Sequence, residues 1–425
     1  MKKRILVFPC GSEVGLEIHR AMQYSAHFEL VGGSSVDDHG RFVYEEYVGD
    51  LPLHDAPEFA AALEHILRTR QIDAVFPAMD GVAEIIQQLR PKLGIRVIGS
   101  DSEATAICAS KQRTMALLED RIPLPRRYDN LDTVDAFPIF IKPDRGYGSR
   151  HTLLAETPEV ARHFLGRHAP GSMLLLEYLP GREWTVDCFS DRHGRMRFHG
   201  ARQRNRIRNG ISVNTTSGTD FDSEFGGWAE TINALLRPRG AWFFQARLDA
   251  SGQPRLLEVG ARPGGSSGLF RALGVNLPLL SAFDAFEQDV EIAANRYSVE
   301  LDRALDNRFR LGLEYSCIYV DLDDCLVCAG RLNHQLVGFL FKASSEGKRL
   351  VLLTRHADAP AETLHRLRLR DLFDEIIHIT DGRPKSDHIR ERNAIFIDDS
   401  HRERSEVARA HNIPVFAPDM VECLM

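Results

Sequence analysis

Apolar residues recur along the first hundred positions in two alternating patterns. Short apolar runs such as 5–8 and 73–76 are typical of buried strands. Between them, apolar residues in the segment 57–70 are spaced by three and four positions, as on one face of a helix. Strands that alternate with helices predict a parallel sheet covered on both faces. We therefore expect residues 1–103 to form an α/β domain.

The pattern changes after residue 103. A helix is expected over 104–119, followed by apolar strands joined by short turns of the kind that connects antiparallel strands. This favours an α+β region over 104–300, and the charged, aperiodic segment 301–314 is expected to be a linker. A second alternation of strands and helices over 315–425 predicts a separate α/β domain. The strands expected after residue 103 are 139–142, 173–179, 184–189, 242–247, 256–259, 317–320, 350–353, 376–377 and 394–397.

Composition narrows the function classes. The 425 residues carry 53 basic and 60 acidic side chains, a net charge of -7 that argues against a general nucleic-acid binder. Seven scattered cysteines favour a reducing compartment. The chain has no apolar run long enough for a signal core or for crossing a bilayer, so we expect a cytoplasmic protein without a membrane partner.

A lysine at the end of a strand marks the first candidate site. Lys142 ends the strand expected over 139–142 and is followed by a glycine-rich segment, 146–149. An ammonium group beside glycines that let backbone N–H groups approach closely is one way to hold phosphates. Taken alone, the same pattern also fits a glycine hairpin with a surface lysine.

Three more charged positions lie at or within apolar strands. Glu177 ends one strand and Glu183 begins the next, where two acceptors suit an adenine amino group and ribose hydroxyls; two solvated strand ends are the alternative. Glu258 stands inside an apolar strand, where an unpaired carboxylate is costly and a Mg²⁺ ion would relieve the cost. Arg262, four residues on, suits a transferring phosphoryl group.

Together with Lys111 and Gln245, this order and spacing resembles the ATP-grasp superfamily, especially the carbamoyl phosphate synthetase large subunit and the carboxylate–amine ligases. The resemblance covers residues 1–300 and implies a Rossmann-like pre-ATP-grasp domain at 1–103 and an ATP-grasp domain at 104–300. It implies that Gln245 and Glu258 bind metal and that Arg262 is catalytic, meeting the phosphate and the intermediate. It further implies that ATP is held by Lys111, Lys142, Gly146, Gly148, Ser149, Glu177, Leu179 and Glu183.

Two positions depart from the family pattern. Gly260 stands where many members have an asparagine two residues after the metal-binding glutamate, and Gln245 stands where many have an acidic residue. Asp249 is a nearby alternative ligand only if the hairpin register shifts. Both departures leave open whether one or two metal ions bind, and neither affects the expectation of ATP binding.

Alternating arginines offer a candidate substrate contact. If the segment is a strand, the four arginines at 202, 204, 206 and 208 lie on one face, where like charges repel unless an anion lies against them. Arg204 and Arg206 are therefore candidate ligands of a phosphate or a substrate carboxylate. The alternative is an edge strand guarded by charge. A nucleic-acid patch is disfavoured because no aromatic residues are interleaved.

The last domain has its own acidic pattern. Asp321 and Asp323 follow a buried strand and flank Leu322, so the two carboxylates suit a nucleophile and a general acid/base. Acids at the carboxyl end of a strand in a parallel sheet stand where ligands bind. Further polar residues that follow expected strands or turns are Thr354, Lys385, Asp398 and Asp399.

This set resembles the haloacid dehalogenase (HAD) superfamily of phosphotransferases over residues 316–418. The resemblance implies that Asp321 is the nucleophile and Asp323 the acid/base, and that Thr354 and Lys385 hold the phosphate, Lys385 as a catalytic residue. It implies a Mg²⁺ site drawn from Asp321, Asp323, Asp398 and Asp399. The spacing after Asp323 leaves no room for a large cap domain, and the pair Cys325 and Cys328 suits small buried residues better than zinc.

We therefore expect an ATP-dependent ligase that joins a small carboxylate to an amine, fused to a HAD-like phosphatase. ATP and Mg²⁺ are the expected cofactors, with Mn²⁺ as an alternative metal. Two other functions stay open, an ATP-grasp kinase that phosphorylates a small molecule and a non-catalytic ATP sensor. The sequence leaves open the two substrates of the ligase, the substrate of the phosphatase and the oligomeric state, a homo-oligomer included.

Overall fold

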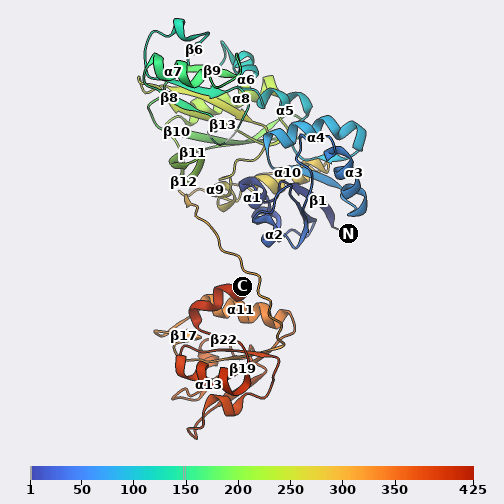
Figure 1. Cartoon of the computed structure of the whole chain (residues 1–425), viewed down its shortest axis with the longest axis vertical. Coiled ribbons are helices and arrows are strands. Elements are labelled where there is room, and N and C mark those ends of the chain that lie inside the picture. Colours follow the sequence, from blue (N-terminus) through green and yellow to red (C-terminus); the bar gives the residue numbers. More distant parts are fainter. Residues whose placement is uncertain (1, 147, 149) are drawn as a thin grey trace. The chain divides into compact units, whose positions relative to one another are not determined.

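The computed structural model describes residues 2–146, 148 and 150–425. The chain divides into two compact units, Met1–Leu305 and Asp306–Met425 (Figure 1). No helix of the described residues is long and apolar enough to cross a membrane. All seven cysteines are free thiols.

The first unit begins with a parallel five-stranded sheet in the order β3-β2-β1-β4-β5. Its strands are β1 (Lys3–Phe8), β2 (Phe28–Gly33), β3 (Glu46–Val48), β4 (Ala74–Pro77) and β5 (Arg96–Val97). The helices between them are α1 (Glu13–Met22), α2 (Gly40–Val43), α3 (Phe59–Thr69) and α4 (Asp80–Leu93).

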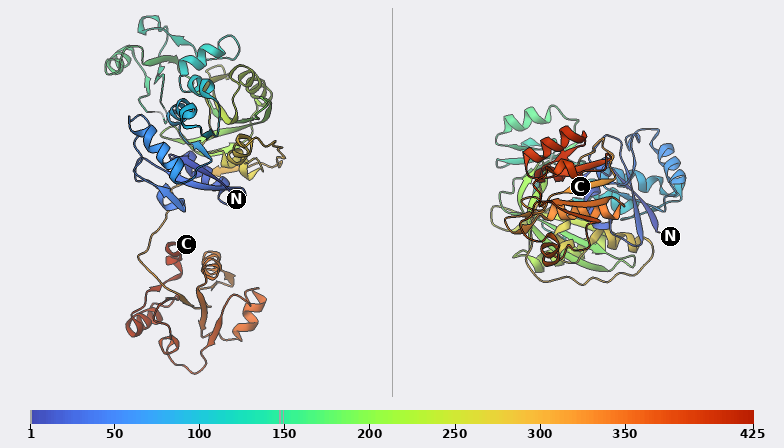
Figure 2. Two further views of the ribbon diagram at one scale, coloured as in Figure 1. Left: turned by 90° about the vertical axis from the view of Figure 1, so that its right-hand side faces the viewer. Right: turned by 90° about the horizontal axis from the view of Figure 1, so that it is seen from below.

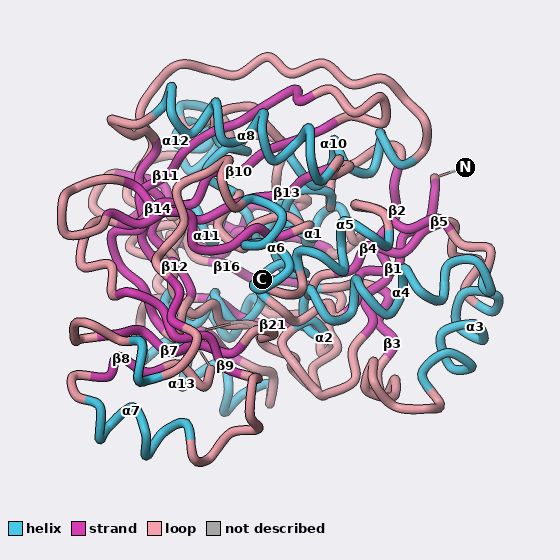
Figure 3. Tube along the Cα trace, turned by 90° about the horizontal axis from the view of Figure 1, so that it is seen from above, coloured by secondary structure: helices cyan, strands magenta, loops and turns pink. Residues whose placement is uncertain are grey.

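Alternate side chains of β1 build two cores, one on each face of this sheet. Ile5 and Val7 pack with α1 and with α10 (Leu277–Ala285), a helix from much later in the chain. Leu6 and Phe8 pack with α3 and α4, which lie beside the sheet in Figure 3. The predicted parallel sheet covered on both faces is therefore present.

The rest of the first unit consists of two antiparallel sheets. The larger sheet has the order β14-β13-β10-β11-β12-β15 and the smaller has the order β6-β9-β7-β8. The larger contains β10 (Glu183–Ser190), β11 (Met196–Arg208), β12 (Ile211–Ser217), β13 (Gly240–Leu248), β14 (Pro254–Gly260) and β15 (Glu300–Asp302). The smaller contains β6 (Arg127–Tyr128), β7 (Ile139–Pro143), β8 (Leu153–Ala155) and β9 (Met173–Glu177).

The larger sheet has helices on one face, and its other face carries the candidate site and packs in part against α10. On the first of these faces, which the helices cover, β10 contributes the buried side chains of Trp184, Val186 and Cys188. The covering helices are α5 (Ser102–Cys108), α6 (Lys111–Leu118) and α8 (Asp222–Leu236). The remaining elements of this unit are α7 (Pro158–Leu165), which packs on the smaller sheet, α9 (Gly268–Ala272) and the 3-10 turn Leu131–Thr133.

Two boundaries differ from the expectations. The helix expected over 104–119 is divided into α5 and α6, because the Ser110 side chain accepts a hydrogen bond from the Arg113 N–H and so begins a new helix. Within the expected linker 301–314, Leu301 and Asp302 still belong to β15, which pairs with β12. The charged pattern of that segment concealed a short edge strand.

The second unit is a parallel sheet in the order β20-β19-β16-β21-β22, flanked by helices on both faces (Figure 2). Its strands are β16 (Cys317–Val320), β19 (Arg349–Thr354), β20 (Glu375–His378), β21 (Ala394–Ile397) and β22 (Val415–Phe416). Its helices are α11 (His334–Ser345), α12 (Pro360–Arg366) and α13 (His401–His411), with 3-10 turns at Lys385–His388 and Pro418–Leu424. A small hairpin, β17 (Val327–Cys328) and β18 (Arg331–Leu332), follows β16.

Candidate functional site

A row of polar side chains crosses the face of the larger sheet that lies opposite the one covered by α5, α6 and α8. Thr185 of β10 lies opposite Gln245 of β13 on one side and opposite Arg202 of β11 on the other. Gln245 in turn lies opposite Glu258 of β14. Because directly opposed residues point to the same face of a sheet, these four side chains form one line. The observed register therefore brings the two predicted metal ligands side by side.

Lys142 reaches this row from the smaller sheet. Its ammonium donates a hydrogen bond of 3.0 Å to the carbonyl of Leu257, next to Glu258. Burial, together with the nearby charge of Lys111, lowers the pKa of Lys142 to about 8, although Glu258 and Glu183 act in the opposite direction. Four residues predicted to serve one nucleotide site thus act electrostatically on one another.

The Asp144 carboxylate fixes Lys111 at the start of α6. It accepts hydrogen bonds from the Ser110 hydroxyl at 2.9 Å and from the Gln112 N–H at 2.7 Å. The Lys111 ammonium then lies within hydrogen-bond distance of the carbonyls of Asp144, at 3.3 Å, and Gly146, at 3.2 Å. The predicted phosphate-binding lysine therefore contacts the start of the glycine-rich segment.

The glycines of that segment have backbone conformations that favour glycine. Gly146 has a φ of +139° and Gly148 a φ of +65°. Ser149, the other predicted ATP contact of the segment, lies outside the described residues. His151, just beyond it, packs against the ring of His168, with centroids 5.8 Å apart.

The segment between β9 and β10 carries the predicted adenosine contacts. Glu177 is half-buried at the end of β9, and Leu179 is buried. Glu183, at the start of β10, accepts a hydrogen bond from the guanidinium of Arg204. The sequence reasoning did not pair these two residues, whose charges neutralise each other here.

The four alternating arginines do not share one face, and that expectation is wrong. The β11–β12 ladder is irregular on both sides of Arg206. Arg202 and Arg204 are buried, whereas Arg206 and Arg208 are exposed. Arg204 also donates to the Gln245 side-chain oxygen at 2.7 Å, and Arg206 pairs with Asp302 at 2.6 Å. The use of Arg204 and Arg206 as anion ligands stays a prediction.

Asp187 and Arg202 form an ion pair that is closed to solvent. Arg202 Nε donates to Asp187 Oδ2 at 2.6 Å, and the two side chains are 3% and 0% exposed. The second oxygen of Asp187 and Nη1 of Arg202 have no hydrogen-bond partner among the described residues. The turn at Gly264 lies directly against this pair, since a Cβ there would fall 2.7 Å from Asp187 Oδ1.

Arg262 has a partner that the sequence did not indicate. Its Nε and Nη2 donate to the two carboxylate oxygens of Asp80, at 3.0 and 2.9 Å. Its guanidinium also lies 5.3 Å from the ring centroid of Phe243. That ring fills the space beside Gly260, where a Cβ would lie 2.5 Å from ring atoms. Glycine at position 260, where many family members have asparagine, therefore leaves room for the Phe243 ring that contacts Arg262.

The donor set on β13 and β14 fits one hard cation. No hydrogen bond or ion pair reaches the Glu258 carboxylate from the described residues, although the side chain is only partly exposed. Gln245 lies opposite Glu258, and its amide oxygen accepts one hydrogen bond from Arg204, which leaves a second lone pair for a cation. Mg²⁺ is commonly bound through one or two such oxygens together with substrate phosphates and waters. Asp249 lies in the β13–β14 turn and pairs with Arg255, so it is not part of this set.

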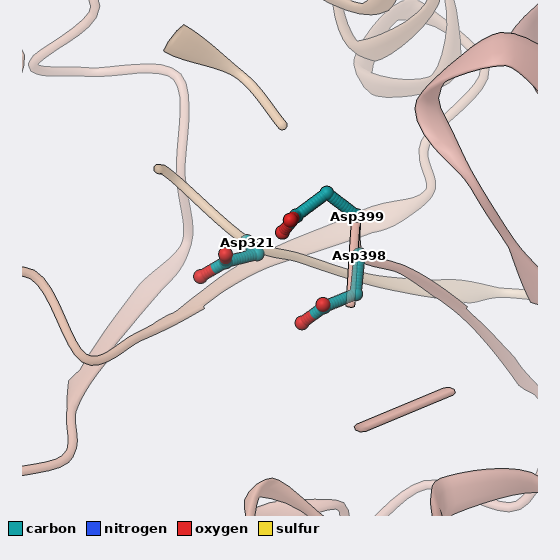
Figure 4. A group of neighbouring side chains, drawn as sticks. All are labelled: Asp321, Asp398 and Asp399. Carbon is teal, nitrogen blue, oxygen red and sulfur yellow. The ribbon is translucent and has the colours of Figure 1, made fainter. Parts of the chain in front are cut away.

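The second unit brings three carboxylates together at the carboxyl ends of β16 and β21. Oxygens of Asp321, Asp398 and Asp399 lie within 4.8 Å of one another (Figure 4). The Lys385 ammonium pairs with Asp321 at 2.8 Å and with Asp398 at 2.6 Å. Burial raises the pKa of Asp321 to about 6, with Asp398 adding to the shift and Lys385 opposing it. Carboxylate oxygens of this kind suit Mg²⁺.

Asp323 was predicted to be a metal ligand, but it does not belong to this cluster of carboxylates. Its oxygens lie 2.9 and 3.0 Å from Nδ1 of His356, and Nε2 of that ring lies 2.9 Å from the Thr363 hydroxyl. The sequence reasoning missed His356. The available signal was its position two residues after Thr354, a buried residue at the end of β19 whose hydroxyl accepts from the His356 N–H.

The cysteine pair of the second unit was expected to consist of small buried residues, and Cys328 is only partly buried. Cys325 is fully buried, and its thiol points to the carbonyl of Ile397 at 3.7 Å. Cys328 lies in the β17 strand and contacts the carbonyl of Cys325 at 3.4 Å. Within the described residues, neither thiol belongs to a cluster able to hold a metal ion.

Comparison with known proteins identifies relatives of this chain. Residues 170–304 match a family model described as ATP-grasp in the biosynthetic pathway with Ter operon. The D-alanine–D-alanine ligase of Thermotoga petrophila is 28% identical over 141 residues, which are 31% of this chain and 46% of that protein. The chain thus spans about half the length of the curated relatives it matches.

Solved structures with a similar fold include three ATP-dependent enzymes. The biotin carboxylase domain of Hydrogenobacter thermophilus 2-oxoglutarate carboxylase, in complex with MgADP and bicarbonate, has a TM-score of 0.58 at 17% identity, covering 69% of this chain and 72% of that one. N5-carboxyaminoimidazole synthetase from Staphylococcus aureus with ADP gives 0.58 at 14%, covering 69% and 81%. L-amino acid ligase from Bacillus licheniformis gives 0.54 at 16%, covering 68% and 75%.

Proposed function

We propose, from the premise that the first unit has the ATP-grasp fold, that it is an ATP-dependent ligase. The ligase activates a small carboxylate as an acyl phosphate, which an amine then attacks to form a C–N bond. The observation that carries the proposal is that Lys142 of the smaller sheet bonds to β14 next to Glu258, which lies opposite Gln245 in the larger sheet. Lys142 is buried and no described residue forms an ion pair with Glu258, so phosphates suit the ammonium and a Mg²⁺ ion suits the carboxylate.

Each residue of the candidate site has a role that follows from its position along the sheets. Lys142 and Lys111 neutralise the phosphates, and the segment between β9 and β10 receives the adenine. A bound Mg²⁺, held by Glu258 and Gln245, would supply further neutralisation of the phosphate charge. Arg262 orients the acyl phosphate. Since phosphoryl transfer depends mainly on positioning and charge neutralisation, these residue types are sufficient for it.

The atoms balance in two steps. A carboxylate oxygen of the first substrate bonds to the γ-phosphorus of ATP, and the bond to the β–γ bridging oxygen breaks to release ADP. The amine nitrogen of the second substrate then bonds to the acyl carbon, and phosphate leaves. The nitrogen loses its proton to solvent or to the departing phosphate.

A paired-substrate screen tests the ligase. Amino acids and other small carboxylates are offered in pairs to the full chain with Mg-ATP, and ADP, free phosphate and product mass are measured. We expect ADP, phosphate and a condensed product. Lys142→Ala and Glu258→Gln should each abolish turnover, whereas Glu103→Gln, an exposed residue of α5, should not. A phosphorylated product without free phosphate would establish a kinase instead, and ATP binding without turnover would establish a sensor.

We further propose that the second unit is a Mg²⁺-dependent HAD-type phosphohydrolase. The carboxylates of Asp321, Asp398 and Asp399, with Lys385 among them, support this proposal. An oxygen of Asp321 bonds to the substrate phosphorus as the ester oxygen leaves and takes a proton from Asp323. Water then bonds to the phosphorus and gives a proton to Asp323, while the bond between the phosphorus and the Asp321 oxygen breaks, which restores both carboxyl groups and releases phosphate.

Generic phosphate esters test the second unit. We expect Mg²⁺-dependent hydrolysis of p-nitrophenyl phosphate by the full chain and its loss in Asp321→Asn. The matched control is Asp324→Asn, because Asp324 is an exposed carboxylate three residues further along and its φ of +52° is one that asparagine tolerates. Hydrolysis that persists in Asp321→Asn would overturn the proposal.

A further inference from the structure

His356 contacts the predicted acid/base Asp323 from a neighbouring strand of the second unit. Asp323 follows β16, and His356 follows β19, which pairs with β16. Nδ1 of the His356 ring lies 2.9 and 3.0 Å from the two oxygens of Asp323. Because a carboxylate only accepts hydrogen bonds, Nδ1 carries the hydrogen of this contact. No other hydrogen bond or ion pair reaches the Asp323 carboxylate from the residues that the structure describes.

Three elements of the second unit hold His356 in place. Its backbone N–H donates to the Thr354 hydroxyl at the end of β19, at 3.1 Å, and its carbonyl accepts from Nε2 of His378 at the end of β20, at 2.8 Å. Nε2 of its ring lies 2.9 Å from the hydroxyl of Thr363, a buried residue of α12. A hydroxyl can donate to the ring nitrogen that carries no hydrogen, so Thr363 and Asp323 favour the same form of the ring. The orientation of the ring is therefore set by the sheet and by α12.

The contact with His356 keeps Asp323 apart from the carboxylates that suit Mg²⁺. Those carboxylates, whose oxygens lie within 4.8 Å of one another, are Asp321, Asp398 and Asp399 (Figure 4). An ester oxygen that leaves the phosphorus takes its proton from a group that the metal ion does not occupy. Asp323 meets this condition while it is bonded to His356, and its side chain is 54% exposed, where a leaving alcohol can depart.

The His356–Asp323 pair directs a carboxylate more than it stabilises the fold. Exposed ion pairs usually contribute little to stability, because two mobile side chains lose entropy when they meet. Here the ring is only 15% exposed and already has a second partner in Thr363, so only the Asp323 side chain has to be ordered. The pair therefore sets the position of the carboxylate at a small entropic cost.

We propose, on the basis of the phosphohydrolase activity proposed above, that His356 is a positioning residue for Asp323. Its ring holds the Asp323 carboxyl group away from the metal ion and beside the ester oxygen that leaves. That oxygen takes the proton of Asp323 as its bond to phosphorus breaks. Through its backbone N–H, His356 also contacts Thr354, the predicted phosphate ligand, so one residue connects the groups at the two ends of the breaking bond.

Esters with different leaving groups test the role of His356. The full chain with Mg²⁺ is assayed on p-nitrophenyl phosphate, whose leaving group departs without a proton, and on phenyl phosphate, whose leaving group needs one. Because a general acid contributes about 100-fold to 10,000-fold to such a step, we expect His356→Ala to lower kcat for phenyl phosphate about tenfold or more, and kcat for p-nitrophenyl phosphate less than about threefold. His356→Asn should recover part of the loss, because its amide N–H stands close to the position of Nδ1. The matched control is His365→Ala, an exposed change on α12.

Equal falls of kcat for the two esters would overturn the proposal, because damage to the fold acts on both esters alike. An unchanged kcat for phenyl phosphate in His356→Ala would also overturn it. Thr363→Val removes only the contact at Nε2 of the ring, and it should change the two rates in the same direction by a smaller factor. This variant decides the question if His356→Ala does not fold.

Nitrogen-15 spectra of the full chain with labelled histidines test the placement of Asp323 without turnover. The His356 signals are assigned by their loss in His356→Ala. We expect hydrogen on Nδ1 in the wild type and on Nε2, the form that free histidine prefers, in Asp323→Ala. A wild-type ring without hydrogen on Nδ1 would overturn the proposal.

The two measurements separate this proposal from the activity on which it rests. If the wild type hydrolyses neither ester, the phosphohydrolase proposal fails, and the role of His356 in catalysis fails with it. The spectra then still decide whether His356 holds the Asp323 carboxylate. If the wild type hydrolyses both esters and His356→Ala lowers both rates equally, the phosphohydrolase stands and only the role of His356 is overturned.

Discussion

The ammonium of Lys142 and the backbone carbonyl of Leu257 are joined by a hydrogen bond of 3.0 Å, across 115 positions of the chain. This bond connects the end of β7 in the smaller sheet to β14 in the larger. It places the predicted phosphate lysine next to the predicted metal carboxylate, Glu258. The site is therefore made at the contact of two sheets, and its charge balance depends on both.

The pH dependence of ATP binding should report the charge of Lys142. Burial lowers the pKa of Lys142 to about 8, so the side chain is charged below that pH and neutral above it. Phosphates bind the charged form, and the affinity for ATP should therefore fall up to about tenfold per pH unit above 8. Lys142→Arg should abolish this dependence, because arginine stays charged. Titration calorimetry between pH 6.5 and 9.5 measures both, and a flat wild-type profile would contradict the assignment.

A side chain at Gly260 should destabilise the first unit. Its Cβ would lie 2.5 Å from ring atoms of Phe243, so Gly260→Ala should lower the free energy of unfolding by about 1–3 kcal/mol through overpacking. Combining it with Phe243→Leu should recover part of the loss. The control is Gly227→Ala in α8, where a Cβ meets nothing within 4 Å and the helix gains stability. Urea unfolding measures the free energy of unfolding of each variant. Equal values for Gly260→Ala and Gly227→Ala would refute the prediction.

Replacing one partner of the buried Asp187–Arg202 pair should lower the free energy of unfolding more than replacing both partners. Arg202→Met leaves a carboxylate without a partner in a closed environment, and we expect a loss of about 3–5 kcal/mol. Replacing both residues, by Asp187→Leu with Arg202→Met, should be less destabilising than the single change, because no charge remains buried. Thermal unfolding of both variants measures their stabilities. A single variant more stable than the double variant would contradict the prediction.

Lys385 should be needed for stability at neutral pH. Lys385→Met leaves Asp321 and Asp398 as close buried carboxylates, and we expect a loss of about 3–5 kcal/mol at pH 7. The loss should shrink as the pH falls toward 6, because burial raises the pKa of Asp321 to about 6 even beside Lys385, which lowers it, so without Lys385 this carboxyl is protonated at a higher pH and the repulsion is removed. Lys342→Met, an exposed change on α11, is the control. A loss that does not depend on pH would show that packing, not charge, is responsible.

The sequence predicted the layers of the molecule better than its contacts. Alternating apolar runs placed the N-terminal parallel sheet, and the order of charged motifs indicated the ATP-grasp fold, which the comparisons confirm. The identification of the second unit as HAD-like stays a prediction, although its parallel sheet is present. These features are local or periodic, so a single sequence carries them.

The contacts that escaped prediction depend on long-range packing. Nothing near Asp80 in the sequence indicates Arg262, which lies 182 positions away and is oriented by Phe243. Likewise, strict alternation in β11 did not reveal the irregular ladder around Arg206, which separates buried from exposed arginines. Such irregularities follow from the pairing of β11 with β12 rather than from the residues of β11 alone.

The segment 303–312 contains no helix or strand, and Leu305 within it is fully exposed. Ten residues of extended chain span at most about 35 Å. Two domains joined by so short a flexible tether keep a local concentration on the order of millimolar, which does not depend on the amount of protein in solution. If the ligase forms a phosphorylated product that the second unit accepts, hydrolysis would therefore compete with the loss of that product to the surrounding solution, and dilution of the protein would not weaken this competition.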